Sequence, residues 1–520
     1  MHSAILFIFF LRVTFAVAQT AADLCTRLPL PQFEEFKVLS GEGVVISQLG
    51  SVSFCNFTAV ITHPEAEDTV YITVGLPLSG WNGRFVANGG GGFSEDGDVS
   101  VPNILSSVSQ GYATATTDGG LTLNHTIDAG TGAWGITSEG NINTGLLKNF
   151  AYRSIHDMTV LSKAAIKSFY GSEARYSYYS GCSTGGRQGY FAAQLYPGDF
   201  NGVLADAPAL YTPQLASALF WPYTVMQNEI VPPQCIFDAF QNASIEYCDM
   251  LDGVKDGIIS EPWNCDYDPR TLLGSTVLCL DPISVIKITQ QHVDVYSKTI
   301  RGPETLSNDP MWYGLAPGSP TGLVANTTTI EGKEVATPMS MAASWIKYFV
   351  TLDPEYNLEN ATFSEYESLY NTALRLYSGV LGNNDPDLSA FEQHGGKLLT
   401  WHGLADPLID YQSTIHYRQV IDKKMGGTHR VNKFYRLFLA PGASHCISAS
   451  GPAPVDALGS LVSWVESGIE PNHLNASLGS LGEISWDLCP YPQILEYNGI
   501  GPTNIASSYT CGRGPESWYV

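Results

Sequence analysis

The chain has 520 residues, of which 44% are hydrophobic and 15% are charged, so it is long enough to bury one large core or several smaller ones. This composition predicts a globular protein and excludes a disordered one. The formal net charge of −24 argues against nucleic acid and against an anionic membrane as partners.

The N-terminus is typical of a secretory signal peptide. Residues 4–11 are an apolar run, and Ala16-Val17-Ala18 is a cleavage motif, so residues 1–18 are predicted to be removed. A membrane anchor is the alternative, but the run is short and Arg12 interrupts it. The ten cysteines and several N-x-[ST] sequons also favour export into an oxidising compartment. We expect a secreted, extracellular protein, glycosylated at sequons among Asn56, Asn124, Asn242, Asn326, Asn360 and Asn475.

In chain order, the first half alternates strand patterns with helical ones. Residues 25 to about 80 are predicted to form a β-rich edge. Further short apolar or alternating runs predict strands at 68–74, 84–87, 112–116, 175–179 and 201–208, with helices at 157–169 and 186–195. Strands that alternate with helices predict an α/β fold with a mainly parallel central sheet and helices on both faces.

The alternation stops at about residue 211. Prolines, aromatic residues, sequons and cysteines crowd the stretch 211–390, which we interpret as a lid domain inserted over one edge of the sheet. Strand patterns return at 396–403 and 434–439, followed by a helix at 455–467 and a cysteine-bracketed tail. The predicted organisation is a catalytic α/β domain of residues 19–210 and 391–520, interrupted by the lid domain.

The stretch Gly181-Cys182-Ser183-Thr184-Gly185 matches the G-x-S-x-G nucleophile elbow of α/β-hydrolases. A predicted strand precedes it and a predicted helix follows it, which is the context that gives the motif meaning. The turn strains the backbone of the serine, so small neighbours are needed, and Gly181 and Gly185 supply them. A glycine-rich loop that matches by chance is the alternative reading.

A serine nucleophile needs a base and an acid, which follow it in the order Ser, Asp or Glu, His in this fold. Asp406 and His445 each follow one of the last two predicted strands of the sheet, so they complete a candidate triad with Ser183. His445 would take the proton of the serine, and Asp406 would orient the imidazole. His402 is a rival base and Asp410 a rival acid. Taken singly, Asp406 could be an ordinary turn residue and His445 a solvated loop histidine.

Acyl transfer also needs N–H donors that stabilise the oxyanion. The backbone N–H of Thr184, directly after the serine, is one expected donor. The second is expected in the glycine run 89–92, where Gly91 is preferred over Gly90 and Gly92. A phosphate-binding loop is disfavoured because no Lys-Ser/Thr pair follows the glycines.

Two cysteines flank the candidate catalytic residues: Cys182 precedes Ser183, and Cys446 follows His445. If the triad forms, these thiols lie close together, and a disulfide would tie the nucleophile turn to the histidine loop. Two buried free cysteines are the alternative, which secretion disfavours.

The segment 249–258 contains three aspartates with glycines between them, which favours a hard cation such as calcium (Ca2+). The predicted ligands are all oxygen atoms, from the carboxylates of Asp249, Asp252 and Asp256 and the main-chain carbonyls of Val254 and Ile258. The closing glutamate of an EF-hand is absent, and a cluster of Asp-Gly turns is the alternative. Because the segment lies in the predicted lid, we expect a structural ion, with Cys248 and Cys265 bracketing the loop.

These motifs resemble the fungal tannase and feruloyl esterase family over nearly the whole mature chain. The resemblance rests on residues 181–189, 403–407, 445–446 and 248–257. It implies a secreted α/β-hydrolase with a lid, a lid calcium ion and a Ser183–Asp406–His445 triad tied by a disulfide. It also implies the pairings Cys25–Cys55, Cys248–Cys265 and Cys489–Cys511, which leaves Cys235–Cys279, although sequence alone does not fix this connectivity.

Within the family, Phe93 and residues 232–235 and 472–477 resemble tannases more than type-B feruloyl esterases. The expectation is a serine carboxylic ester hydrolase for small-molecule esters of phenolic acids, with gallate esters favoured and no organic cofactor. The aromatic lid residues Trp221, Tyr223, Trp312, Tyr313 and Trp345 are candidate walls of an aromatic pocket or ordinary core residues. The alternatives are a feruloyl esterase, a carboxylesterase of a secondary-metabolite pathway, a serine peptidase and a non-catalytic binding protein on the same fold.

Overall fold

The computed structural model describes residues 20–47, 53–66, 68–95, 100–280, 283–479 and 482–519. The predicted signal peptide, residues 1–18, lies outside the described residues.

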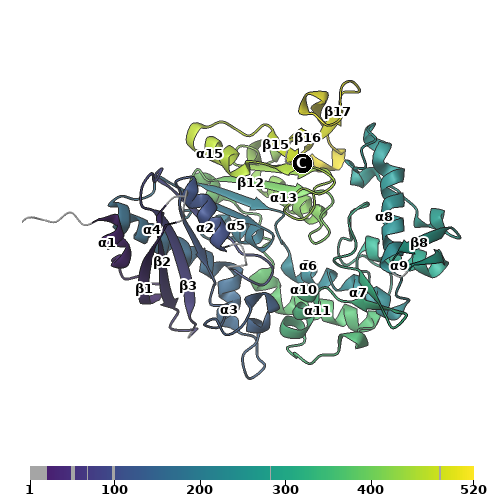
Figure 1. The fold of residues 1–520 in the computed structure, drawn as a ribbon, viewed down its shortest axis with the longest axis horizontal. Helices are drawn as coiled ribbons and strands as arrows, with labels where there is room; N and C mark the ends of the chain where they lie inside the picture. Colours follow the sequence, from purple (N-terminus) through teal and green to yellow (C-terminus); the bar gives the residue numbers. More distant parts are fainter. Residues whose placement is uncertain are drawn as a thin grey trace, which may run out of the picture.

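A nine-stranded sheet runs through the centre of the molecule in the order β1-β2-β3-β5-β4-β6-β7-β12-β13 (Figure 1). Its strands are β1 (Lys37–Ile46), β2 (Phe54–Thr62), β3 (Val70–Pro77), β4 (Arg84–Asn88), β5 (Ala113–Thr117), β6 (Tyr176–Cys182), β7 (Gly202–Asp206), β12 (Lys397–Gly403) and β13 (Tyr435–Ala440). The pairs from β1 to β5 are antiparallel, and the pairs from β5 to β13 are parallel. The predicted α/β fold with a mainly parallel sheet is therefore confirmed.

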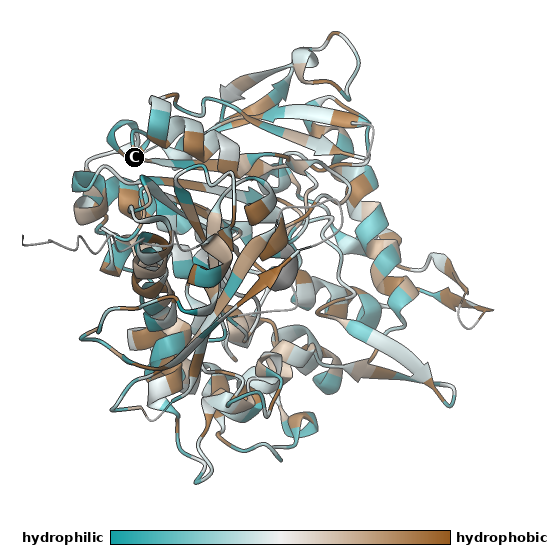
Figure 2. Ribbon diagram, turned by 60° about the vertical axis from the view of Figure 1, so that its left-hand side comes forward, coloured by the Kyte–Doolittle hydropathy of each residue, from teal (hydrophilic) through white to brown (hydrophobic). Residues whose placement is uncertain are grey.

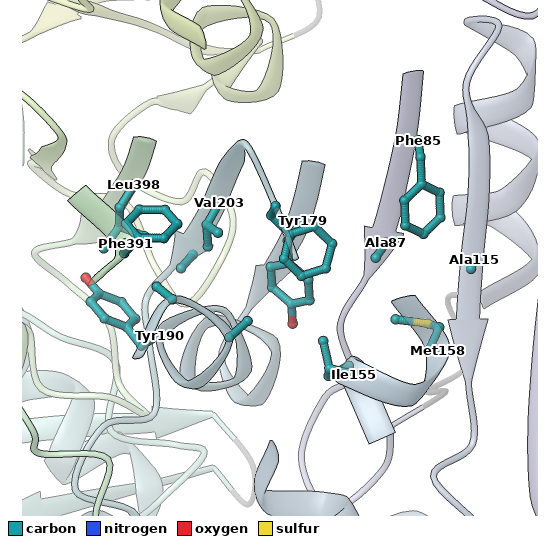
Figure 3. Close-up of a cluster of buried hydrophobic side chains, with 14 of the residues drawn as sticks. Phe85, Ala87, Ala115, Ile155, Met158, Tyr179, Tyr190, Val203, Phe391 and Leu398 are labelled. Carbon is teal, nitrogen blue, oxygen red and sulfur yellow. The ribbon is translucent and has the colours of Figure 1, made fainter. Parts of the chain in front are cut away.

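Helices cover both faces of this sheet. The helices α4 (Ser154–Tyr170), α5 (Thr184–Leu195) and α13 (Tyr411–Met425) pack on one face, while α2 (Ser100–Ser109) and α15 (Ala457–Ser467) pack on the other. Figure 3 shows the first face, where Phe85, Tyr179 and Val203 of the strands meet Ile155 of α4 and Tyr190 of α5. In Figure 2 hydrophobic colours gather on the central strands, because strands covered on both faces bury almost every side chain.

The segment between β7 and β12 adds no strand to the nine-stranded sheet within the described residues. It consists of α6 (Thr212–Ala218), α7 (Trp221–Asn228), α8 (Gln234–Cys248), α9 (Gln290–Arg301), α10 (Ser340–Ser344), α11 (Phe363–Leu381), α12 (Ser389–Gln393) and the hairpins β8 (Thr276–Leu280)–β9 (Ile283–Lys287) and β10 (Asn326–Ile330)–β11 (Lys333–Thr337). It occupies the place where the sequence predicts the lid, and we call residues 211–390 the lid segment.

The lid segment shares its hydrophobic core with an early part of the chain. Phe349 of the lid segment lies 5.0 Å from Phe93 and 5.2 Å from Trp134, measured between ring centroids. Trp345 and Phe150 belong to the same buried cluster. The lid segment therefore contributes most of one buried cluster and shares that cluster with residues near the glycine run.

Short elements complete the fold. They are α1 (Ala21–Thr26), α3 (Thr144–Lys148), α14 (Thr428–Val431), β14 (Ala453–Pro454), β15 (Leu474–Leu478), β16 (Ile484–Leu488), β17 (Gln493–Tyr497) and β18 (Tyr509–Arg513). The last five form two small antiparallel sheets at the C-terminal end of the chain.

Candidate active site

Ser183 sits on a sharp turn between β6 and α5. Its backbone has φ 64° and ψ −122°, a region that residues other than glycine rarely occupy, and its N–H donates to the carbonyl of Asp206 at 3.0 Å. A Cβ on Gly181 would lie 2.7 Å from the backbone of Gly185, so the turn requires glycine at position 181. This is the geometry of a nucleophile elbow, with the side chain presented at the end of the sheet.

Asp406 and His445 are hydrogen-bonded to each other, with 2.7 Å between Oδ2 and Nδ1. Asp406 follows β12 and His445 follows β13, the neighbouring parallel strand. Asp406 is buried, and its Oδ1 also accepts the N–H groups of Leu408 and Ile409 at 2.8 and 3.0 Å. Burial alone would raise the pKa of Asp406, but hydrogen bonds from His402 and His445 outweigh it and hold that pKa below its usual value.

The two rival residues have structural tasks. His402 is fully buried, and its Nδ1 and Nε2 pair with Thr414 Oγ1 at 2.9 Å and the carbonyl of Ile409 at 3.1 Å. Asp410 caps α13 and accepts hydrogen bonds from the Ser413 N–H and the Trp312 Nε1–H. Neither side chain lines the cavity that contains Ser183 and His445.

A disulfide joins Cys182 to Cys446, two residues separated by 264 positions in sequence. It therefore fastens the neighbours of Ser183 and His445 to each other. Cys446, like Ser183, has a positive φ, so both segments that carry the catalytic candidates adopt an uncommon backbone at this point. The other four pairings are those that the family resemblance implies: Cys25–Cys55, Cys235–Cys279, Cys248–Cys265 and Cys489–Cys511.

Ser183 and His445 open into one cavity of about 700 Å³. Its walls come from the glycine run, the elbow, α6, the start of α10 and the loop after Asp406. The Ser183 hydroxyl forms no hydrogen bond with a described residue, which leaves it accessible to a substrate, and such bonds are often long in free enzymes. The cavity has two aromatic walls, Phe93 and Phe150. None of the five aromatic lid residues singled out in the sequence lines it.

The structure corrects the expected oxyanion donor in the glycine run. The N–H of Gly91 donates to the carbonyl of Ser94 at 2.9 Å, so it is not available to a substrate. The N–H groups of Gly92 and Thr184 form no hydrogen bond with a described residue, and the Thr184 hydroxyl links the two segments by donating to the Gly92 carbonyl at 2.7 Å. Gly92 therefore replaces Gly91 as the candidate partner of Thr184.

Glu95 stabilises the glycine run through buried hydrogen bonds, and no sequence motif predicts this role. Its Oε2 accepts a hydrogen bond from Gln188 Nε2, and Gln188 Oε1 accepts the Gly90 N–H at 3.1 Å and the Tyr179 hydroxyl at 3.2 Å. Burial raises the pKa of Glu95 to about 8, although Arg187 and Gln188 oppose the shift. A buried network that includes an acid thus fixes the loop opposite the nucleophile.

The acidic segment 249–258 folds into a compact turn. One carboxylate oxygen of Asp249 accepts the N–H groups of Asp256 and Gly257, and Asp252 and Asp256 each accept an N–H two residues on. Burial, with repulsion between the carboxylates, raises the pKa of Asp256 to about 6. Carboxylate and carbonyl oxygens are the donor type that hard cations prefer. The described residues contain no group of three or more His, Cys, Asp or Glu side chains arranged to hold a metal, so calcium stays a prediction.

Comparisons with known proteins agree with the geometry. A family profile described as tannase and feruloyl esterase matches residues 55–512. A probable feruloyl esterase of Arthroderma benhamiae is 40% identical over 474 residues, covering 89% of this chain and 86% of the relative.

Two solved structures share the fold. A tannin acyl hydrolase from Aspergillus niger has a TM-score of 0.84 at 24% identity and covers 97% of this chain and 98% of its own. The feruloyl esterase B structure from Aspergillus oryzae has a TM-score of 0.76 at 25% identity, with 94% and 99% covered. With the profile match over most of its length, the chain belongs to the tannase and feruloyl esterase family of carboxylic ester hydrolases.

Proposed function

We propose that this enzyme hydrolyses esters of phenolic acids through Ser183, His445 and Asp406. The Ser183 hydroxyl attacks the ester carbonyl and passes its proton to His445 Nε2, while Asp406 accepts the Nδ1–H and stabilises the imidazolium. The N–H groups of Gly92 and Thr184 would bind the oxyanion. His445 then protonates the leaving alcohol, and water, activated by the same imidazole, cleaves the acyl-enzyme and regenerates the serine.

One observation carries this proposal: the Cys182–Cys446 disulfide holds the two segments together beside a single cavity that both Ser183 and His445 line. The 2.7 Å hydrogen bond between His445 Nδ1 and Asp406 Oδ2 supplies the acid, the third member of the triad. The substrate class is supported by the relatives, which are named for feruloyl and tannin esters. These names favour neither acid over the other for this chain.

Replacing Ser183 by alanine tests the mechanism. We expect Ser183→Ala to lower kcat on methyl ferulate or methyl gallate by about 10⁴-fold or more while the far-UV circular dichroism spectrum stays unchanged. The control is Ser109→Ala, an exposed serine at the end of α2, which should keep wild-type kcat. A fluorophosphonate probe should label the peptide that contains Ser183. Activity of Ser183→Ala near that of the wild type contradicts the mechanism.

We further propose that the segment 249–258 holds a structural calcium ion. The oxygen donors of Asp249, Asp252 and Asp256 and the carbonyls of Val254 and Ile258 would hold it, and the ion would supply charge neutralisation to three neighbouring carboxylates. Removing calcium with a chelator should therefore lower Tm, and adding it back should restore Tm. The same treatment of Asp252→Asn should produce a smaller shift. A Tm that chelation leaves unchanged in the wild type argues against the ion.

We also propose that the enzyme is secreted and glycosylated. In the described part of the chain, the helices lack the length or the apolar character needed to span a bilayer. All ten cysteines are paired, and five of the six sequons present an exposed asparagine, with Asn56 half-buried on β2. N-terminal sequencing of the protein from a fungal culture medium should start at Gln19, and treatment with an N-glycosidase should reduce its mass. Retention of all material inside the cells contradicts the proposal.

A further inference from the structure

Apart from Thr212, the side chains that the lid segment and the loop after Asp406 contribute to the cavity are apolar. They include Leu215, Leu219, Met339, Met341, Leu408 and Ile409. Met341 reaches the candidate oxyanion loop, because its Cε lies 3.5 Å from the point where a Cβ on Gly92 would be. The group that enters this cavity is therefore surrounded by aliphatic and thioether side chains.

The lining contains one arginine and one aspartate, and both are hydrogen-bonded to main-chain groups. Arg187 is fully buried, and its Nη1 and Nη2 donate to the carbonyls of Ala151 at 3.0 Å and Phe150 at 2.8 Å. Asp206 accepts the Trp401 N–H at 3.1 Å and lies opposite Cys182 in the sheet register, at the base of the cavity. Burial raises the pKa of Asp206 well above its usual value. Arg187 and Asp206 of the described lining are thus both tied to main-chain groups.

The neutral polar side chains of the lining are few. Three of them are hydrogen-bonded internally: Asn88 to Thr114, Thr184 to Gly92 and Thr212 to Ala209. Apart from Ser183 and His445, the described lining side chains without such a bond are Asn103 and Ser180. Ser180 lies on β6, three residues before the nucleophile, whereas Asn103 comes from α2. Of these two side chains, Asn103 is therefore the one that does not come from the strand that carries the nucleophile.

A galloyl ring carries three adjacent hydroxyl groups, and each loses its hydrogen bonds to water when the ring is buried. The two side chains of the described lining without an internal hydrogen bond, Asn103 and Ser180, are fewer than these three hydroxyl groups, whereas methoxy or alkyl groups gain from the apolar walls. We infer that this cavity selects phenolic esters whose acid is O-methylated or otherwise apolar, with Asn103 binding one polar substituent, and disfavours polyhydroxylated acids such as gallic acid. This inference rests on the proposed function and narrows its substrate class.

Methyl gallate and its tri-O-methyl ether form a matched pair that tests the apolar preference, because they share one carbon skeleton and one leaving group. We expect kcat/KM for the ether to exceed that for methyl gallate by about 10- to 100-fold, the range in which an apolar pocket rejects hydroxyl groups. Equal values, or a preference for methyl gallate, overturn the inference and leave the proposed function intact. If neither ester nor methyl ferulate is hydrolysed in a Ser183-dependent way, the proposed function itself fails.

Two variants test the walls directly. Met339→Gln places an amide in the apolar wall and should lower the ether-to-gallate ratio of kcat/KM about tenfold, whereas Leu278→Gln, on the exposed face of β8, should leave this ratio unchanged.

Asn103→Leu should lower kcat/KM for methyl ferulate about tenfold relative to its O-methyl ether, because the ether has no phenolic hydroxyl for Asn103 to bind. An unchanged ether-to-gallate ratio in Met339→Gln, or an unchanged ferulate-to-ether ratio in Asn103→Leu, contradicts the corresponding assignment.

Discussion

At the scale of single residues, two histidines share one carboxylate but have different environments. His445 is partly exposed, with 17% of its side chain accessible, and it faces the cavity, while His402 is fully buried and bonded on both ring nitrogens. Asp406 receives one hydrogen bond from His445 at 2.7 Å and a longer contact from His402 at 3.3 Å. His402 thus holds Asp406 in place, and His445 is the ring that can exchange a proton with a substrate.

Glu95 gives a residue-scale prediction about activity. Glu95→Leu removes the acceptor that holds Gln188, so the Gly90 N–H loses a fixed partner. We expect the glycine run 89–92, which carries the candidate oxyanion donor Gly92, to shift as a result. Misplacement of this kind lowers kcat by about 10- to 100-fold. Glu95→Gln keeps an acceptor for Gln188 and should retain most of the activity. Equal kcat for both variants, measured on the same ester, contradicts a positioning role for Glu95.

The wild type and Glu95→Gln together give a pH dependence of stability. The pKa of Glu95 is about 8 in the folded state, against 4.5 for an unperturbed glutamate, so the unfolded chain releases this proton first as the pH rises. Wild-type stability must therefore fall between pH 4.5 and about 8 relative to Glu95→Gln, which has no such proton. Tm measured across this window should show a difference that grows in favour of Glu95→Gln. A constant difference would contradict the raised pKa.

At the scale of elements, the Cys182–Cys446 disulfide links the β6–α5 turn to the loop after β13. We expect Cys182→Ala/Cys446→Ala to lose about 2–5 kcal/mol of stability, because the unfolded chain is released from a long cross-link. Its kcat should fall as well, since the two catalytic segments are no longer fastened together.

The matched control for this element is Cys489→Ala/Cys511→Ala, which removes the bridge beside the β17–β18 hairpin. This control should lose stability and keep kcat, as measured by thermal unfolding and ester hydrolysis. If the first double variant keeps wild-type kcat, the disulfide stabilises the fold without organising the active site.

At the scale of the whole molecule, the shared core predicts how the protein unfolds. Phe93, Trp134 and Phe150 pack with Trp345 and Phe349 of the lid segment in one buried cluster. Because the two parts complete one core, we expect a single calorimetric transition. Trp345→Ala should lower the temperature of that one transition, at a cost of about 3–5 kcal/mol. Two separated transitions would show that the lid segment folds independently.

Much of the fold and all three members of the candidate triad follow from local sequence patterns and their order in the chain. The strand before Ser183 and the helix after it have periodicities that depend on neighbouring residues, and the strand predicted at 175–179 overlaps β6 from residue 176 onward. The order of Ser183, Asp406 and His445 follows from the order of parallel strands. The cysteines beside Ser183 and His445 indicate that the two segments meet, because cysteines of a secreted protein are usually paired in disulfides.

Only the tertiary structure decides the parts that depend on contacts between distant segments. The sequence cannot distinguish Gly90, Gly91 and Gly92, because all three are glycines. In the structure, the Gly91 N–H donates to the Ser94 carbonyl, so Gly91 is not available as an oxyanion donor. Glu95 carries no motif, and its role arises because Gln188, 93 residues away, lies against it. The apolar walls follow from packing of the lid segment over the sheet edge. The sequence by itself determined the candidate triad, because the nucleophile, base and acid are predicted from residue type and chain order. The tertiary structure decided which donors and walls surround these residues, because hydrogen-bond partners and packing depend on segments far apart in the chain.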